Sequence, residues 1–129
     1  MPLTEQARAE IIALFDDWNA SLATGDPARV TELFAPDAVM LPTISNWVLT
    51  DHDRIFEYFE RFMALKPQGR VEKSHVRLYG DIALHAGIYR FTMGATGEEV
   101  GARFTFVYRR ENGNWMIEHQ HSSTLPEKE

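Results

Sequence analysis

Apolar residues in the first fifth of the chain recur at the spacing of an α-helix. Successive members lie 3, 1, 3 and 4 positions apart, which places them all on one helical face. They are Ile11, Leu14, Phe15, Trp18 and Leu22. Thr4 can cap the start of this helix, and Gly25 ends it. The pattern therefore predicts an amphipathic helix that buries one side.

A shorter helix and a strand are expected next. Asp26 as a cap and Pro27 at the first helical position are typical of a helix start, and the helix is expected to cover Ala28 to Phe34. A strand from Ala38 to Leu41 follows. The segment ISNWVLT at 44–50 is expected to be either a second short strand or an ordered loop.

A second apolar stripe predicts a third helix. Its members are Ile55, Tyr58, Phe59, Phe62 and Met63, again at helical spacing. Either Asp51 or Asp53 can cap this helix, and the sequence KPQG at 66–69 ends it.

The rest of the chain is rich in strand-forming residues punctuated by turns. Four long strands are expected at Arg70–Tyr79, Ile82–Met93, Val100–Arg110 and Trp115–Thr124. Asn112-Gly113 between the last two is a strong hairpin signal. Three helices followed by antiparallel strands predict one α+β domain over residues 1–129, ordered roughly from 4 to 124. A strongly curved sheet closed by helices makes a cone with an open mouth.

Alternating positions on the strands do not separate into an apolar and a polar face. On Ile82–Met93, one face carries Leu84, Ala86, Ile88 and Arg90, and the other carries His85, Gly87, Tyr89 and Phe91. A sheet that is apolar on both sides is usually covered on both sides. We therefore expect helices on one face and a partner subunit on the other, in a homodimer or a ring of dimers.

Composition narrows the function classes. The formal net charge is -6 and no basic stripe is present, which disfavours nucleic-acid binding because phosphate neutralisation needs clustered Lys and Arg. Cysteine is absent, so disulfides and thiolate chemistry are excluded. No signal peptide or apolar run of membrane-spanning length is visible, so we expect no membrane partner and a cytoplasmic location. No phosphate-binding loop is found, so no cofactor is expected.

Two long segments resemble known families. The segment LFDDWNASLATGDPARVTELFAPDAVMLPT resembles the opening of nuclear transport factor 2-like (SnoaL-like) proteins. The segment YRRENGNWMIEHQHSS resembles the end of the calcium/calmodulin-dependent protein kinase II association domain, and WVLTDHDRIFEYFERF and HVRLYGDIALHAGIYRFT fit between them. The resemblance implies a cystatin-like cone and a habit of assembly. It does not imply phosphoryl transfer, because the glycine-rich loop and the HRD and DFG motifs of kinases are missing.

Five residues are the candidates for a ligand pocket: Arg90, Arg103, His119, His121 and Trp47. The resemblance implies pocket arginines near Arg90 and Arg103, and an arginine in a half-closed apolar cone would bind a carboxylate. Arg103 could instead lie at a solvated strand end or in a salt bridge.

The two histidines are two positions apart, so in a regular strand they share a face with Trp115 and Ile117. They could be structural, pocket groups or metal ligands, but a metal site needs a third ligand that no spacing identifies, so none is expected. Trp47 either closes the pocket mouth or joins an interface.

Two functions follow from these candidates. The first is an oligomeric module whose conical pocket holds a small anionic or aromatic ligand. The second is a small cofactor-independent enzyme, a dehydratase, isomerase or cyclase, that uses His121 as base and Arg103 to stabilise an anion. No clear acid/base pair stands out, which favours the first.

Overall fold

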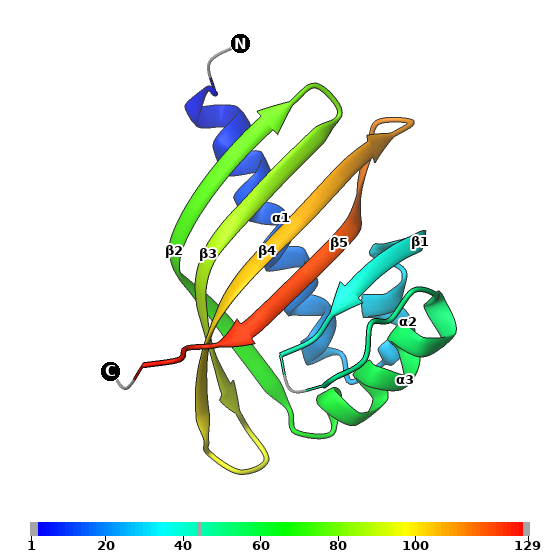
Figure 1. Ribbon diagram of the computed structural model, residues 1–129, viewed down its shortest axis with the longest axis vertical. Coiled ribbons are helices and arrows are strands. Elements are labelled where there is room, and N and C mark those ends of the chain that lie inside the picture. Colours follow the sequence, from blue (N-terminus) through cyan, green and yellow to red (C-terminus); the bar gives the residue numbers. More distant parts are fainter. Residues whose placement is uncertain (1–2, 44, 128–129) are drawn as a thin grey trace.

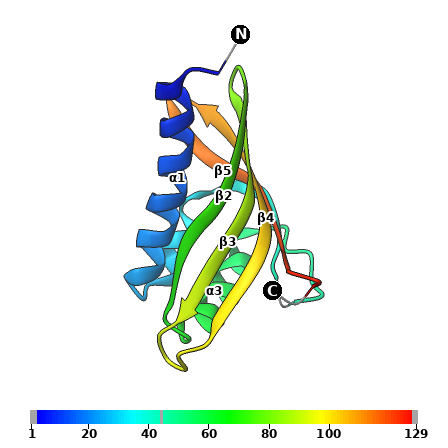
Figure 2. The same ribbon diagram turned by 90° about the vertical axis from the view of Figure 1, so that its left-hand side faces the viewer.

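The computed structural model describes residues 3–43 and 45–127, and in it the chain folds into helices packed on one side of a curved sheet (Figures 1 and 2). The N-terminal half contains α1 (Glu5–Ala23), α2 (Pro27–Thr31), β1 (Phe34–Leu41) and α3 (His52–Met63). The other strands are β2 (Pro67–Tyr79), β3 (Ile82–Met93), β4 (Glu99–Glu111) and β5 (Asn114–Thr124). The expected α+β architecture is confirmed. No helix of the described residues is both long and apolar enough to cross a bilayer.

Side-chain caps fix the starts of the three helices. The Thr4 hydroxyl accepts from Ala7 N at 3.0 Å, and the Asp26 carboxylate accepts from Ala28 N at 3.0 Å. Asp51, rather than Asp53, caps α3 by accepting from Arg54 N at 2.8 Å. The α2 helix ends at Thr31, earlier than the sequence predicted, because β1 already begins at Phe34.

The sheet has five strands in the order β1-β5-β4-β3-β2. The four long strands pair antiparallel as expected, and β1 adds to the sheet parallel to β5. Residues 45–50 form a loop rather than a strand, and Ile44 lies outside the described residues. The loop is tied back by one bridge, in which Met40 and Leu49 exchange backbone hydrogen bonds of 2.9 Å each.

A β-bulge in β5 decides which side chains face the helices. Tyr108 pairs with Ile117, but Val107 pairs with His119, so Glu118 is an extra residue in the strand. An extra residue reverses the alternation beyond it. Ile117 therefore faces the helices while His119 does not, and the expectation that they share a face is wrong.

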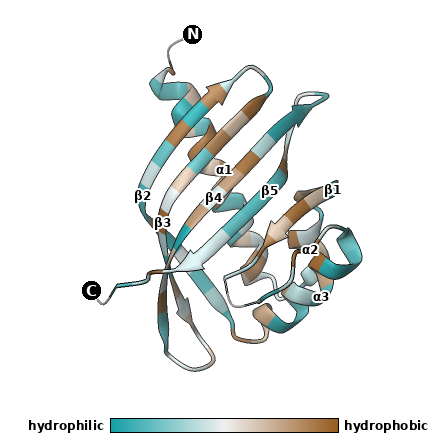
Figure 3. Cartoon of the chain, viewed as in Figure 1, coloured by the Kyte–Doolittle hydropathy of each residue, from teal (hydrophilic) through white to brown (hydrophobic). Residues whose placement is uncertain are grey.

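The core fills the space between α1 and the inner face of the sheet, which is the face toward the helices. Trp18 is its centre: its ring stacks on Tyr89 and meets Phe59, Phe91 and Phe106 edge-on, with ring centroids 5.5 to 6.4 Å apart. Figure 3 shows hydrophobic and hydrophilic positions interspersed along β3 and β4, so hydropathy alone does not mark the buried face of these strands. Burial of these rings is the main stabilising contribution to the fold.

Candidate functional site

The structure places four of the five predicted site residues outside the cone. The four residues pair in register with neighbours on the outer face of the sheet; they are Arg90, Arg103, His119 and His121. Two of them, Arg103 and His121, are exposed. None of the four lines either of the two cavities described below. Their expected place in the cone wall is therefore corrected, and the β5 bulge is the physical reason for the two histidines.

The outer-face arginines contact other surface side chains. Arg90 lies 3.4 Å from the Glu72 carboxylate, and Arg103 donates to the Ser123 hydroxyl at 3.2 Å. Within residues 3–43 and 45–127, no group of three or more His, Asp or Glu side chains is arranged to hold a metal ion. The cations and imidazoles of this face therefore lie at the surface and not around an enclosed cavity.

The cone itself contains a cavity of about 50 Å³ between α1, α3 and the inner face of the sheet. Most of its wall is apolar or aromatic: Trp18, Met40, Pro42, Tyr58, Phe59, Phe62, Phe91, Met93, Val100 and Ala102. The polar groups come from three places: Thr43 after β1, Tyr89 on β3, and Gln120 and Ser122 on β5. An apolar cavity with a few convergent polar groups is the usual form of a small-molecule site.

The polar groups of the cavity form one hydrogen-bonded cluster around the Tyr89 hydroxyl. The side chains of Thr43, Gln120 and Ser122 all hydrogen-bond this hydroxyl, and the Thr43 and Ser122 hydroxyls also bond each other. Burial raises the pKa of Tyr89, which outweighs the lowering effect of these hydrogen bonds. The cluster is therefore neutral at physiological pH.

Two further polar atoms at the cavity wall have no hydrogen-bond partner among the described residues. They are Nε1 of Trp18, a donor, and Oε1 of Gln120, an acceptor. Buried polar atoms are normally paired, so each unpaired atom costs free energy until something bonds it. A ligand with one acceptor and one donor would satisfy both.

A second buried polar pair lies elsewhere on the inner face, away from the cavity wall. His85 is fully buried, its Nε2 lies 2.8 Å from the Ser74 hydroxyl, and its Nδ1 has no partner among the described residues. Burial, together with the nearby Arg8 charge, lowers the pKa of His85 to about 4. Neither His85 nor Ser74 lines the cone cavity.

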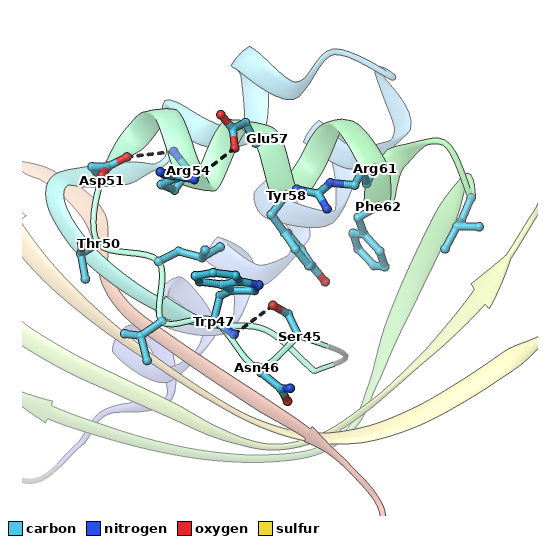
Figure 4. A pocket seen from close by; sticks show the side chains of 13 residues that line it. Ser45, Asn46, Trp47, Thr50, Asp51, Arg54, Glu57, Tyr58, Arg61 and Phe62 are labelled. Carbon is cyan, nitrogen blue, oxygen red and sulfur yellow. Dashed lines mark hydrogen bonds and ion pairs between the residues drawn. The ribbon is translucent and has the colours of Figure 1, made fainter.

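Trp47, the fifth predicted residue, lines a larger and more open groove of about 760 Å³. Figure 4 shows the groove between the loop that carries Trp47 and the face of α3 that carries Arg54, Tyr58 and Arg61. Tyr58 and Phe62 line both the groove and the cone cavity, so they form a wall between the two spaces.

Gln120 and Tyr89 line the cavity but were not among the candidates that the sequence indicated. The bulge at Glu118 breaks the alternation in β5, so that Gln120 faces the helices together with Ile117 while the histidines face outward. A polar glutamine between two histidines gives no signal of burial.

Comparisons with known proteins agree with this fold. The family model of the calcium/calmodulin dependent protein kinase II association domain matches residues 7–126. The chain belongs to this association-domain family. No curated protein sequence matches the chain.

Solved structures of bacterial association-domain and NTF2-like proteins superpose closely. A Xanthomonas campestris protein that carries the same family description is 46% identical, with a TM-score of 0.92, covering 99% of this chain and 94% of that one. An NTF2-like protein of unknown function from Pseudomonas putida is 23% identical, with a TM-score of 0.82 and coverage of 99% and 93%.

A more distant structure carries an enzyme description. It is a Parabacteroides distasonis protein described provisionally as a ketosteroid isomerase, 20% identical, with a TM-score of 0.74 and coverage of 96% and 92%. At that identity the likeness shows the shared fold alone. The association-domain protein therefore has the NTF2-like, cystatin-like cone, with a function that its own residues must indicate.

Proposed function

We propose that this association-domain protein is an oligomeric module whose conical pocket binds a small anionic or aromatic ligand. The observation that carries the proposal is the convergence of four neutral polar side chains, around Tyr89, inside an otherwise apolar cavity. No charged side chain of the described residues lines this cavity. An aromatic ligand with one hydroxyl or carbonyl group therefore fits it better than an anion does.

The size of the cavity supports a small ring. Its 50 Å³ accommodates only a few waters, so a ring must displace side chains slightly on entry. Met40 and Met93 both line the cavity. Methionine is unbranched and adapts to irregular spaces, so these two side chains can shift at little cost.

The outer sheet face supports the oligomeric half of the proposal. Leu84, Ile88 and Val107 are half-buried on this face, where Leu84 pairs with Val107 and Ile88 pairs with Arg103. The described helices pack on the opposite face (Figure 2). Half-buried apolar side chains without a covering element are typical of a protein–protein interface.

Phenol is a suitable first probe, because it pairs a ring with one hydroxyl. We expect isothermal titration calorimetry to detect saturable 1:1 binding per chain. Gln120→Leu should weaken that binding about tenfold, the value of one buried hydrogen bond to the ligand. Gln6→Leu, the same change at an exposed position of α1, is the control and should bind like the unmodified protein. Equal affinity in Gln120→Leu and the unmodified protein would refute the cavity as the site.

The enzyme hypothesis has less support in this geometry. Its two residues, His121 and Arg103, lie on the outer face, and no imidazole or carboxylate of the described residues lines the cavity. Imidazoles and carboxylates are the commonest general acids and bases, and burial raises the pKa of the two tyrosines that line the cavity, Tyr58 and Tyr89. The cavity is therefore built for binding rather than for proton transfer.

A further inference from the structure

We propose that the groove between the loop at 45–51 and α3 is a second binding site, and that it takes a small aromatic carboxylate. Arg61 binds the carboxylate and Trp47 packs on the ring. This site goes beyond the proposed cavity function and does not depend on it. Its volume of about 760 Å³ lies within the usual range for small-molecule sites, roughly 300 to 1,000 Å³.

The loop holds an aromatic side chain in solvent without burying it. The Met40–Leu49 bridge anchors one end of the loop, and the Ser45 hydroxyl accepts from Trp47 N at 3.1 Å near the tip. Trp47 nevertheless remains 74% exposed, and Val48 beside it 56%. An exposed large apolar surface on an anchored loop is characteristic of a binding site, because it gains free energy only when something covers it.

Most of the charged side chains that line the groove already have a partner, and one does not. The Asp51 carboxylate caps α3 through Arg54 N. The Arg54 guanidinium lies 3.8 Å from the Glu57 carboxylate. Arg61, in the last turn of α3, has no ion-pair or hydrogen-bond partner within residues 3–43 and 45–127. The groove therefore presents one uncommitted guanidinium, the group best suited to bind a carboxylate in a bidentate way.

The aromatic and cationic groups stand on opposite walls of the same space. Trp47 comes from the loop, whereas Tyr58 and Arg61 project from α3 (Figure 4). Burial raises the pKa of the Tyr58 hydroxyl, so this wall stays neutral beside Arg61. A flat ring between Trp47 and the helix would direct an attached carboxylate toward Arg61.

The test compares 2-naphthoate with 2-naphthamide, which differ in charge but hardly in shape. We expect calorimetry to show at least about tenfold tighter binding of the carboxylate. Arg61→Gln should remove that preference and leave the amide unaffected. Arg29→Gln, the same charge change on exposed α2, should retain it. Trp47→Ala should weaken both probes about three- to tenfold, the usual value of one aromatic pair.

The outcomes separate this site from the cone cavity. Three results would overturn the inference. The first is unchanged naphthoate affinity in Arg61→Gln, and the second is an equal loss of naphthoate affinity in Arg61→Gln and Arg29→Gln. The third is that naphthoate does not bind at millimolar concentration. Gln120→Leu should not affect naphthoate. If it abolishes naphthoate binding while Trp47→Ala does not, the ligand enters the cone and the groove proposal fails.

Discussion

The two faces of the sheet are made by alternate residues of the same strands, yet they differ in almost every physical property. On β4, Phe104 and Phe106 face inward and are nearly inaccessible to solvent, whereas Arg103 and Thr105 face outward. The inner face carries a neutral hydrogen-bonded cluster and a histidine with a low pKa. The outer face carries charged side chains in surface ion pairs. The difference shows that the chemistry of a strand residue here depends on which side the helices cover.

The largest expected change in stability comes from a substitution on the inner face. Phe106 contacts Phe15, Trp18, Phe104 and Tyr108 in the centre of the core. Phe106→Ala should lower the free energy of unfolding by about 3 to 5 kcal/mol, because it leaves a cavity that the surrounding rings cannot fill. Urea denaturation measures this. Val107→Ala, one residue along on the outer face, should cost less than about half as much, and equal costs would contradict the assigned faces.

The next effect is a pH dependence that comes from His85. Its pKa is about 4 in the folded protein, against the 6.5 of an unburied histidine. Between pH 4 and pH 6.5, His85 therefore binds a proton more readily in the unfolded chain than in the folded protein. Stability contributed by the neutral imidazole is complete above pH 6.5 and is lost as the pH falls toward 4. The loss should be roughly 2 to 3 kcal/mol.

A comparison of variants isolates this contribution from other acid effects. Unfolding free energies of His85→Gln and the unmodified protein, measured between pH 7 and pH 4, should converge as the pH falls. His121→Gln, the same substitution at an exposed histidine of the outer face, is the control for replacing a histidine. If the His85→Gln profile runs parallel to that of the unmodified protein, the buried histidine is not the cause.

A smaller effect concerns assembly through the outer face. Leu84→Lys introduces a charge beside half-buried Val107 on the outer face without touching the core. The dissociation constant of the proposed oligomer should rise at least about tenfold, because the lysine charge must then lose its water in the interface. Light scattering coupled to gel filtration measures the mass. An unmodified protein that is monomeric at all concentrations would refute this part of the proposal.

The smallest effect is expected at Arg103. Its guanidinium is exposed and makes one hydrogen bond, to Ser123. Arg103→Gln should therefore change the free energy of unfolding by no more than about 0.5 kcal/mol and leave phenol affinity unchanged. A large loss of ligand affinity would restore Arg103 to the pocket and contradict the face assignment.

Local patterns in the sequence predicted most of the elements, because each rests on contacts near in sequence. The helical stripe around Trp18, the Asp26-Pro27 start and the Asn112-Gly113 hairpin are all confirmed. The parallel pairing of β1 with β5 was not predicted. It joins Val39 to His119 across most of the chain, and no local pattern encodes a contact at that separation.

The candidate site was harder to predict because it depends on one extra residue. The bulge at Glu118 leaves no mark in the composition, yet it turns His119 and His121 outward and Gln120 inward. The rule that alternate residues of a strand share a face holds only where no bulge interrupts the strand. Trp47 could be identified as unusual, because it is a large aromatic in a polar segment, and that signal depends on the residue itself rather than on register.

The most direct test of the account is the NMR signal of the Trp18 indole N–H during a phenol titration. The Trp18 Nε1 is buried at the cavity wall and has no partner among the described residues. We predict that this signal shifts and saturates, while that of Trp115, whose indole donates to Glu10 on the surface, stays in place. An unmoved Trp18 signal, with phenol bound or not, would show that the cone cavity is not a ligand site.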